Sequence, residues 1–245
     1  MEVRKAMNII SIGGGSLRKQ QTLSIDRYIV KLAGKKHPRA LFIPTASSDD
    51  EKYCTAFDRV YGKLLGCKTD HLLLSRRRED RAAAARKIES ADLIYVGGGN
   101  TLRMMKMWRR LGIDKLLIKA GRRGTVLAGL SAGAICWYEW GHSDSLAYTG
   151  KKNWSYIKVR SLGLCKGLYC PHLDSEKRHP SFKKMVIRER MTGIACDNFA
   201  AVHNSDTGAV CVTARSRARV HVYAYANGHV TISKFKNGEN IVLPR

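Results

Sequence analysis

The sequence predicts an α/β fold in which a mostly parallel sheet is covered by helices on both faces. The first observation is a set of short, nearly continuous apolar runs, which are typical of strands buried on both faces. The second is that segments of helical character alternate with these runs, as in repeated strand–helix–strand units. The third is that three runs end in loops rich in glycine or serine, at residues 13–16, 97–100 and 129–134. Parallel strands bring such loops to one edge of the sheet, where ligands bind. Loops 44–49 and 170–174 fit the same edge less closely.

The elements of the first 130 residues each have a sequence signal. The first strand ends at Gly13-Gly14-Gly15, and the second ends at Pro44, because proline cannot continue a central strand. The third helix is rich in alanine, the strongest helix former. The expected order is strand 7–12, helix 21–32, strand 40–44, helix 53–65, strand 71–74, helix 79–89, strand 93–96, helices 101–108 and 114–120, and strand 125–128.

The C-terminal third has a different pattern, in which short strands follow one another without helices. Strands are expected at residues 200–202, 209–212 and 220–225. Asn227-Gly228 and Asn237-Gly238 are dipeptides typical of hairpin turns. We therefore expect antiparallel strands to be added to the same domain. Since no linker, repeat or low-complexity segment interrupts the chain, one domain over residues 1–245 is predicted.

The composition is that of a globular protein without a structural metal. Its 245 residues are 44% hydrophobic and 26% charged, and no apolar run approaches the length of a membrane span. The first five residues lead directly into the first strand without a signal-peptide pattern, so we expect a cytoplasmic protein with no membrane partner. The seven cysteines are odd in number and form no CxxC pair, which argues against a disulfide framework or a zinc cluster. We expect neither a metal nor a cofactor.

The charge is unusual for a globular protein. Lys and Arg number 44 against 20 Asp and Glu, which gives a formal net charge of +24. Such a field attracts anions, including nucleic acid. The basic residues are nevertheless scattered, and no nucleic-acid-binding module is recognisable, so a specific nucleic-acid partner is not expected. Steering of an acidic substrate is the functional alternative to a solvated basic surface. The densest basic runs are 76–78, 109–110, 122–123, 151–152 and 183–184.

The segment Gly129-Leu130-Ser131-Ala132-Gly133 has the pattern of a nucleophile elbow. It follows the apolar run 125–128 and precedes Ile135-Cys136-Trp137-Tyr138, which we interpret as the first turn of a helix. In such an elbow the nucleophile occupies a sharp, strained turn, and larger side chains at the flanking glycines would collide with neighbouring backbone. A small-residue turn with a buried serine has the same pattern, so the motif needs partners elsewhere in the chain.

A serine nucleophile requires a base and a group that orients the base. Among the eight histidines, His172 is the best candidate, because Pro171 fixes the chain before it and a short strand would place it beside the elbow. The residues alone leave four candidates for the orienting acid. These are Asp144, Asp174, Glu176 and Asp197.

The oxyanion hole needs backbone N–H donors. The elbow itself positions Ala132, and the glycine-rich loop 97–99 offers Gly98 and Gly99, with Gly13-Gly14-Gly15 as an alternative loop. Asn100, which ends the first of these loops, is a candidate substrate-binding residue. The glycines at 13–15 lack the full dinucleotide fingerprint and a P-loop lysine, which argues against a nucleotide site.

With these segments in place, the chain resembles the peptidase E family, which comprises aspartyl dipeptidases and the related cyanophycinases. The matching segments occur in the family's order and span most of the chain, and the combination of GGGNT with SAGA is the most specific part. They are residues 12–15, 43–47, 95–101, 129–134, 170–172 and 193–198.

The resemblance implies a fold like that of class I glutamine amidotransferases, with serine in place of the nucleophilic cysteine. It implies Ser131 as nucleophile and His172 as base. The family places an acidic residue between these two, which matches Asp144 and is favoured here, and Asp197 matches a second acidic position. The family's best-known members cleave after an N-terminal aspartate. Segment 135–140 is bulkier and more aromatic than expected of those members, which favours a different substrate.

The predicted function is serine-dependent hydrolysis of a peptide or amide bond, on short peptides as in a dipeptidase. One alternative is an esterase of the α/β-hydrolase type, whose histidine would come later, at His203 or His221. The other is a non-catalytic protein that binds polyanions or nucleic acid. Monomer and homodimer both stay open.

Overall fold

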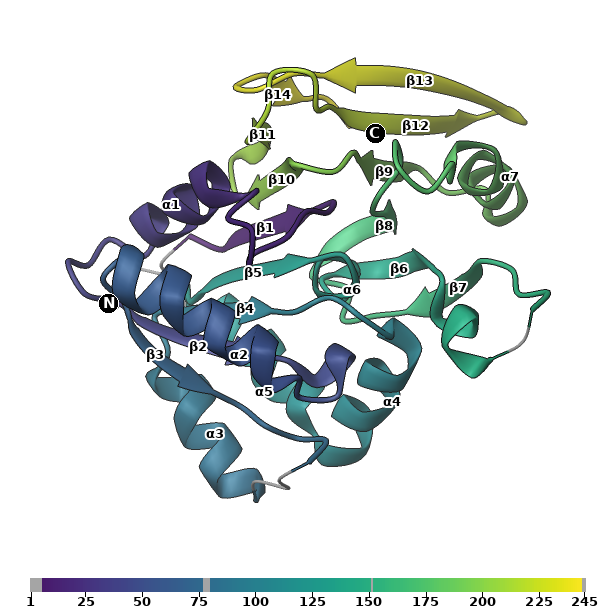
Figure 1. Cartoon of the computed structure of the whole chain (residues 1–245). Coiled ribbons are helices and arrows are strands. Elements are labelled where there is room, and N and C mark those ends of the chain that lie inside the picture. Colours follow the sequence, from purple (N-terminus) through teal and green to yellow (C-terminus); the bar gives the residue numbers. More distant parts are fainter. Residues whose placement is uncertain (1–5, 77–79, 151, 244–245) are drawn as a thin grey trace.

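The computed structural model describes residues 6–76, 80–150 and 152–243, and its central feature is a mixed sheet (Figure 1). Within the described residues this sheet has eight strands. The parallel part has the order β3 (Lys68–His71), β2 (Arg39–Ile43), β4 (Leu93–Val96), β5 (Val126–Leu130), β1 (Asn8–Ile12). Antiparallel strands β10 (Ala200–Ser205), β11 (Gly208–Thr213) and β14 (Asn240–Ile241) continue it beyond β1.

Helices cover both faces of this sheet, which confirms the prediction made from the apolar runs. On one face, Ile10, Phe42 and Tyr95 pack against α1 (Leu23–Leu32) and α2 (Glu51–Phe57). On the other face, alternate residues of the same strands pack against α3 (Arg81–Ser90), α4 (Thr101–Leu111) and α5 (Ile113–Arg122). Every residue of β4 and β5 is buried, because each strand has an apolar layer on both sides.

A second sheet was not anticipated from the sequence. Among the described residues it has six strands, in the order β13 (His229–Phe235), β12 (Val220–Ala226), β9 (Gly193–Cys196), β8 (Cys165–Cys170), β6 (Tyr138–Ser143), β7 (Ile157–Arg160). Helix α7 (His179–Glu189) packs on it through Phe182 and Val186. Asn227-Gly228 forms the expected hairpin turn between β12 and β13. Asn237-Gly238 does not, since β13 and β14 belong to different sheets.

The segment after the elbow also differs from the prediction. Helix α6 (Ala132–Ile135) is only four residues long, and the chain then enters β6. Cys136, Trp137 and Tyr138 are fully buried, so this segment has no solvent-facing side on which an amphipathic helix could continue. Two smaller differences concern the first half. The strand expected at residues 71–74 lies earlier in the chain, as β3 at Lys68–His71. The helix expected at residues 53–65 begins as α2 and continues as a π-helix, Asp58–Leu64.

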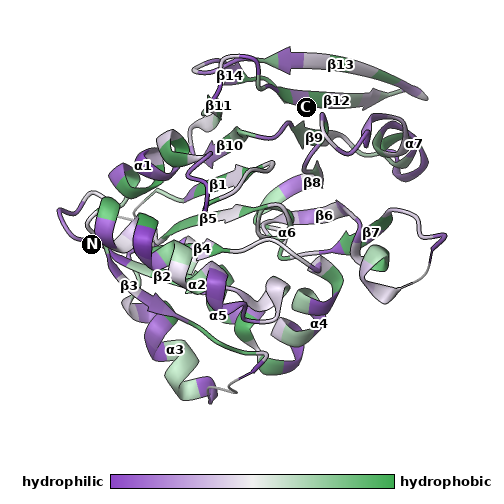
Figure 2. Ribbon diagram, viewed as in Figure 1, coloured by the Kyte–Doolittle hydropathy of each residue, from purple (hydrophilic) through white to green (hydrophobic). Residues whose placement is uncertain are grey.

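Apolar residues concentrate on the strands at the centre of the molecule, while the outward sides of the helices are polar (Figure 2). No helix of the described residues combines the length and apolar character that crossing a membrane requires. Part of the predicted basic runs 76–78 and 151–152, residue 79 of the third predicted helix, and the N-terminal residues 1–5 lie outside the described residues.

Candidate active site

The segment predicted to form an elbow makes a sharp turn at the carboxyl end of β5. Ser131 has φ 55° and ψ −111°, a conformation rarely adopted by residues with a side chain. A Cβ atom on Gly129 would lie 2.2 Å from the Gly133 carbonyl oxygen, and a Cβ on Gly133 would lie 2.0 Å from the Val96 carbonyl oxygen. Only glycine fits at both positions, and this close packing holds Ser131 at the tip of the turn.

The loop that follows β1 connects the distant segments of the site. The carbonyl oxygens of residues 12, 13 and 14 accept, in that order, the backbone N–H groups of Ser131 (3.0 Å), His172 (3.2 Å) and Phe199 (2.9 Å). Three consecutive peptide groups therefore hold the elbow, the predicted base and the segment after β9 side by side. This arrangement brings Ser131, which follows β5 of the first sheet, together with His172, which follows β8 of the second sheet, whereas a single sheet edge was expected.

The imidazole of His172 has Asn198 as its partner. His172 Nδ1 lies 2.8 Å from Asn198 Oδ1. Because an amide oxygen only accepts hydrogen bonds, Nδ1 is the donor in this contact, which in a neutral imidazole leaves the lone pair on Nε2. Asn198 is held in turn by Asp174, whose Oδ1 accepts the Asn198 backbone N–H at 2.9 Å. A Cβ on Gly14 would lie 1.9 Å from Asn198 Oδ1 and 2.3 Å from His172 Nδ1, so this pair occupies the space above a bare backbone.

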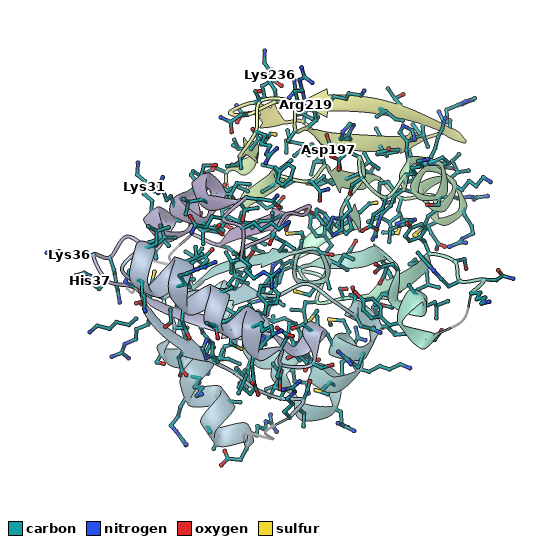
Figure 3. The ribbon with its side chains drawn as sticks, viewed as in Figure 1. Lys31, Lys36, His37, Asp197, Arg219 and Lys236 are labelled. Carbon is teal, nitrogen blue, oxygen red and sulfur yellow. The ribbon has the colours of Figure 1, made fainter. Side chains whose placement is uncertain are left out.

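The two predicted acids have other partners. The Asp144 carboxylate lies 3.3 Å from the guanidinium of Arg178, a fully buried side chain that also binds Glu176. Asp197 Oδ1 lies 3.2 Å from His221 Nε2, and its Oδ2 accepts the Arg219 N–H at 3.0 Å. Figure 3 labels Asp197 and Arg219, which lie on the β9 and β12 side of the molecule. The contact expected between Asp144 and His172 is replaced by the Asn198 contact, since the buried cation Arg178 needs the carboxylates that surround it.

Asn198 was missed because the sequence reasoning considered only carboxylates as orienting groups. An amide can also orient a catalytic histidine, as in cysteine proteases with a Cys-His-Asn arrangement. The signal was present, because Asn198 is the last residue of the 193–198 segment that carried the family resemblance.

The glycine-rich loop after β4 adjoins the elbow, as predicted. A Cβ on Gly98 would lie 3.4 Å from Ser131 Cβ, and the Gly98 backbone hydrogen-bonds the Tyr53 hydroxyl. Ala132 is the first residue of α6, so its N–H has no carbonyl partner within the helix. Within this loop the Gly97 N–H donates to the Ile43 carbonyl at 3.1 Å, and the Gly98 backbone is engaged by Tyr53, so the candidate oxyanion donors are the N–H groups of Ala132 and Gly99.

The side chain of Asn100 is occupied by structural contacts. Its Oδ1 caps α4 by accepting the Arg103 N–H at 3.0 Å, and its Nδ2 donates to the Ser145 carbonyl at 3.3 Å. The predicted role in substrate binding is therefore replaced by a role in holding the loop against its neighbours.

The remaining histidines of interest are held elsewhere. Both ring nitrogens of His203 are engaged, Nδ1 with the Tyr28 hydroxyl at 2.7 Å and Nε2 with Asn8 Oδ1 at 2.9 Å. Burial and the charge of Arg178 lower the pKa of His142 to about 3, which keeps this histidine neutral.

Ser131 Oγ makes no hydrogen bond to His172 among the described residues, and in unliganded hydrolases this contact is often long. The described residues contain no cluster of three or more potential metal ligands.

The comparison with protein families identifies the chain. Residues 9–212 match the family model for peptidase family S51. The chain belongs to peptidase family S51. The region matched includes Ser131, His172 and Asn198.

Relatives of this S51 peptidase are also named as peptidases. The chain is 36% identical over 217 residues to the uncharacterized peptidase YgaJ of Bacillus subtilis strain 168. The matched region covers 87% of this chain and 90% of that relative. The chain is 33% identical over 95 residues to peptidase E of Streptomyces coelicolor, covering 39% of this chain and 36% of that protein.

Solved structures share the fold of this S51 peptidase. The crystal structure of a peptidase from an acI-B1 actinobacterium has a TM-score of 0.75 at 19% identity, with 97% of this chain and 96% of that chain covered. A putative peptidase E protein from Listeria monocytogenes EGD-e has a TM-score of 0.64 at 19% identity, with 85% and 98% covered.

Proposed function

We propose that this S51 peptidase hydrolyses short peptides through an acyl-enzyme on Ser131. His172 Nε2 takes the hydroxyl proton as Ser131 attacks the peptide carbonyl, and it then protonates the leaving amine. Backbone N–H groups of Ala132 and Gly99 stabilise the oxyanion. Water completes the cycle by releasing the acyl group from the serine.

The observation that carries this proposal is the strained Ser131 held next to His172 by consecutive carbonyls of the loop after β1. Asn198, in place of the predicted Asp144, holds the imidazole in the tautomer that leaves Nε2 basic. The engagement of both His203 nitrogens argues against the esterase alternative with that residue as base. The family match and the continuation of the parallel sheet by β10 and β11 support a single domain related to class I glutamine amidotransferases.

The test is hydrolysis of a panel of short peptides by Ser131→Ala, with Ser90→Ala as a matched control, since Ser90 is an exposed residue of α3. We expect Ser131→Ala to lower kcat at least about 10³-fold, because the nucleophile is lost, and to lose labelling by a serine-reactive phosphonate probe. The circular dichroism spectrum should be unchanged. Full activity in Ser131→Ala would overturn the proposed mechanism.

A further inference from the structure

A cavity opens beside the proposed nucleophile, on the α1 and α2 face of the sheet. Its volume is about 340 Å³, at the small end of the range for ligand sites. Leu130 and Gly98 line the cavity, and both adjoin Ser131. Leu130 precedes Ser131 in the chain, and a Cβ atom on Gly98 would lie 3.4 Å from Ser131 Cβ. A group that fills this cavity is therefore attached close to the reacting carbonyl. The other lining residues are Gly15, Ser16, Leu17, Arg18, Asp50, Lys52, Tyr53 and Ala56.

The walls of the cavity are apolar and rigid. Leu17, Ala56 and Leu130 are at most 6% exposed. The Tyr53 ring packs at 4.9 Å between centroids against Phe42, and its hydroxyl is held by the Gly98 backbone. A Cβ on Gly97 would lie 2.9 Å from the Tyr53 ring, so the ring has little room to move. A preformed apolar wall binds an apolar group without a cost of reordering.

The charged residues of the cavity are placed at its mouth. Arg18 and Lys52 are exposed to solvent, so their charges are hydrated. Asp50 caps α2 by accepting the Tyr53 N–H at 2.7 Å. Selection of an acidic side chain would require a cation directed into the cavity, since a desolvated carboxylate needs a partner. None of the described lining residues provides a buried one.

From these contacts we infer that the cavity binds the apolar side chain, leucine or phenylalanine in size, of a residue adjoining the scissile bond. This inference rests on the proposed function and names the substrate class for the same site. Burial of such a side chain predicts a kcat/KM about 10- to 100-fold higher for a leucine or phenylalanine peptide than for the glycine peptide.

The test uses two series of short peptides, in which the residue before or after the scissile bond is glycine, alanine, leucine, phenylalanine or aspartate. Ala56→Leu places a larger side chain in the cavity, and Ala82→Leu makes the same change on the exposed surface of α3. We expect Ala56→Leu to lower kcat/KM at least 10-fold more for the phenylalanine peptide than for the glycine peptide in one series. Ala82→Leu should change neither.

A wild-type preference for aspartate, or an equal loss for all peptides in a folded Ala56→Leu variant, would overturn the inference and leave the hydrolysis intact. If Ala56→Leu does not fold, Leu17→Ala tests the same inference. An enlarged cavity should shift the substrate preference from leucine to phenylalanine, and an unchanged preference would contradict the inference. If the wild type cleaves no peptide, the proposed function fails. Calorimetric titration of Ser131→Ala then tests whether the cavity binds an apolar side chain. The inference requires the phenylalanine peptide to bind at least 10-fold more tightly than the glycine peptide.

Discussion

At the residue scale, the amide of Asn198 sets the protonation pattern of the proposed base. It accepts a hydrogen bond from His172 Nδ1, and it has no negative charge with which to stabilise an imidazolium. The orienting role therefore depends on geometry alone, and it should be sensitive to loss of the amide oxygen.

We predict that Asn198→Ala lowers kcat about 10²-fold or more, because the imidazole loses its fixed tautomer and orientation. Asn198→Asp keeps an acceptor at the same position and should retain most of the activity. Asp144→Asn and Asp197→Asn, assayed in parallel for kcat, should lose less than Asn198→Ala, since both carboxylates contact other residues. A larger loss in Asp144→Asn would restore Asp144 as the orienting residue.

A second residue-scale prediction concerns Asp26, a fully buried residue in the first turn of α1. It accepts hydrogen bonds from Thr22 and Tyr61, and burial raises its pKa from 3.8 to about 7. Between these two values the folded state binds more protons than the unfolded state, so the free energy of unfolding falls as the pH rises. From pH 5 to pH 8 this group should remove roughly 2.5 kcal/mol of stability.

Asp26→Asn keeps the shape of the side chain and abolishes its ionisation. Urea unfolding of both proteins at pH 5 and pH 8 measures the effect as a difference between them, which cancels the titration of other groups. We expect the stability of Asp26→Asn relative to the wild type to increase at pH 8. An identical pH dependence in the two proteins would show that Asp26 is ionised in the fold.

At the scale of the element, the loop after β1 has no room for side chains. We predict that Gly14→Ala lowers kcat at least about 10-fold while the chain remains folded, because the added methyl would overlap Asn198 Oδ1 and His172 Nδ1. Gly34→Ala is the control for glycine replacement, since a Cβ there meets no atom within 4 Å. Its φ of 64° adds some backbone strain, so both variants require a thermal unfolding curve. Equal kinetics in the two variants would contradict the predicted role of the loop.

The elements of the first sheet could be predicted because their local pattern and their environment agree. Strands β4 and β5 are apolar throughout and are buried on both faces. The second sheet could not, since β6 contains Trp140, Gly141 and His142, and its pairing with β8 depends on contacts distant in sequence. The four-residue length of α6 likewise follows from burial of Trp137 in a tertiary core.

The candidate site shows the same difference between features set by local sequence and features set by contacts distant in sequence. Ser131 and His172 were expected at one edge of a single sheet, but they follow strands of two different sheets, and residues 12–14 hold the two segments together. The partner of His172 could not be predicted, because the choice among Asp144, Asp197 and Asn198 depends on which side chains the buried Arg178 and His221 engage. Such competition among charged groups is a property of the assembled fold.

At the scale of the whole molecule, the net charge of +24 is spread over the surface. Lys31, Lys36 and Lys236 are exposed and extend outward from different parts of the molecule in Figure 3. A surface of this kind raises the local concentration of anions around the entire protein, and dissolved salt reduces the effect.

We therefore predict that kcat/KM for a peptide with net negative charge falls severalfold as the ionic strength rises from about 0.02 M to about 0.2 M, where the Debye length becomes short. A neutral peptide with the same residues around the scissile bond should show little change. Initial rates at low substrate concentration measure both. A parallel response of the two peptides would argue against electrostatic steering.

The loop after β1 also determines how the protein can lose activity. Strand β1 is paired on both sides, with β5 and β10, so its hydrogen bonds exchange with solvent only when the centre of the sheet opens. Ser131, His172 and the residue after Asn198 are all held by backbone carbonyls at the end of that strand. The catalytic arrangement and the folded core are therefore lost in the same step. A partly unfolded form that lost either sheet would be inactive, since Ser131 follows β5 of the first sheet and His172 follows β8 of the second.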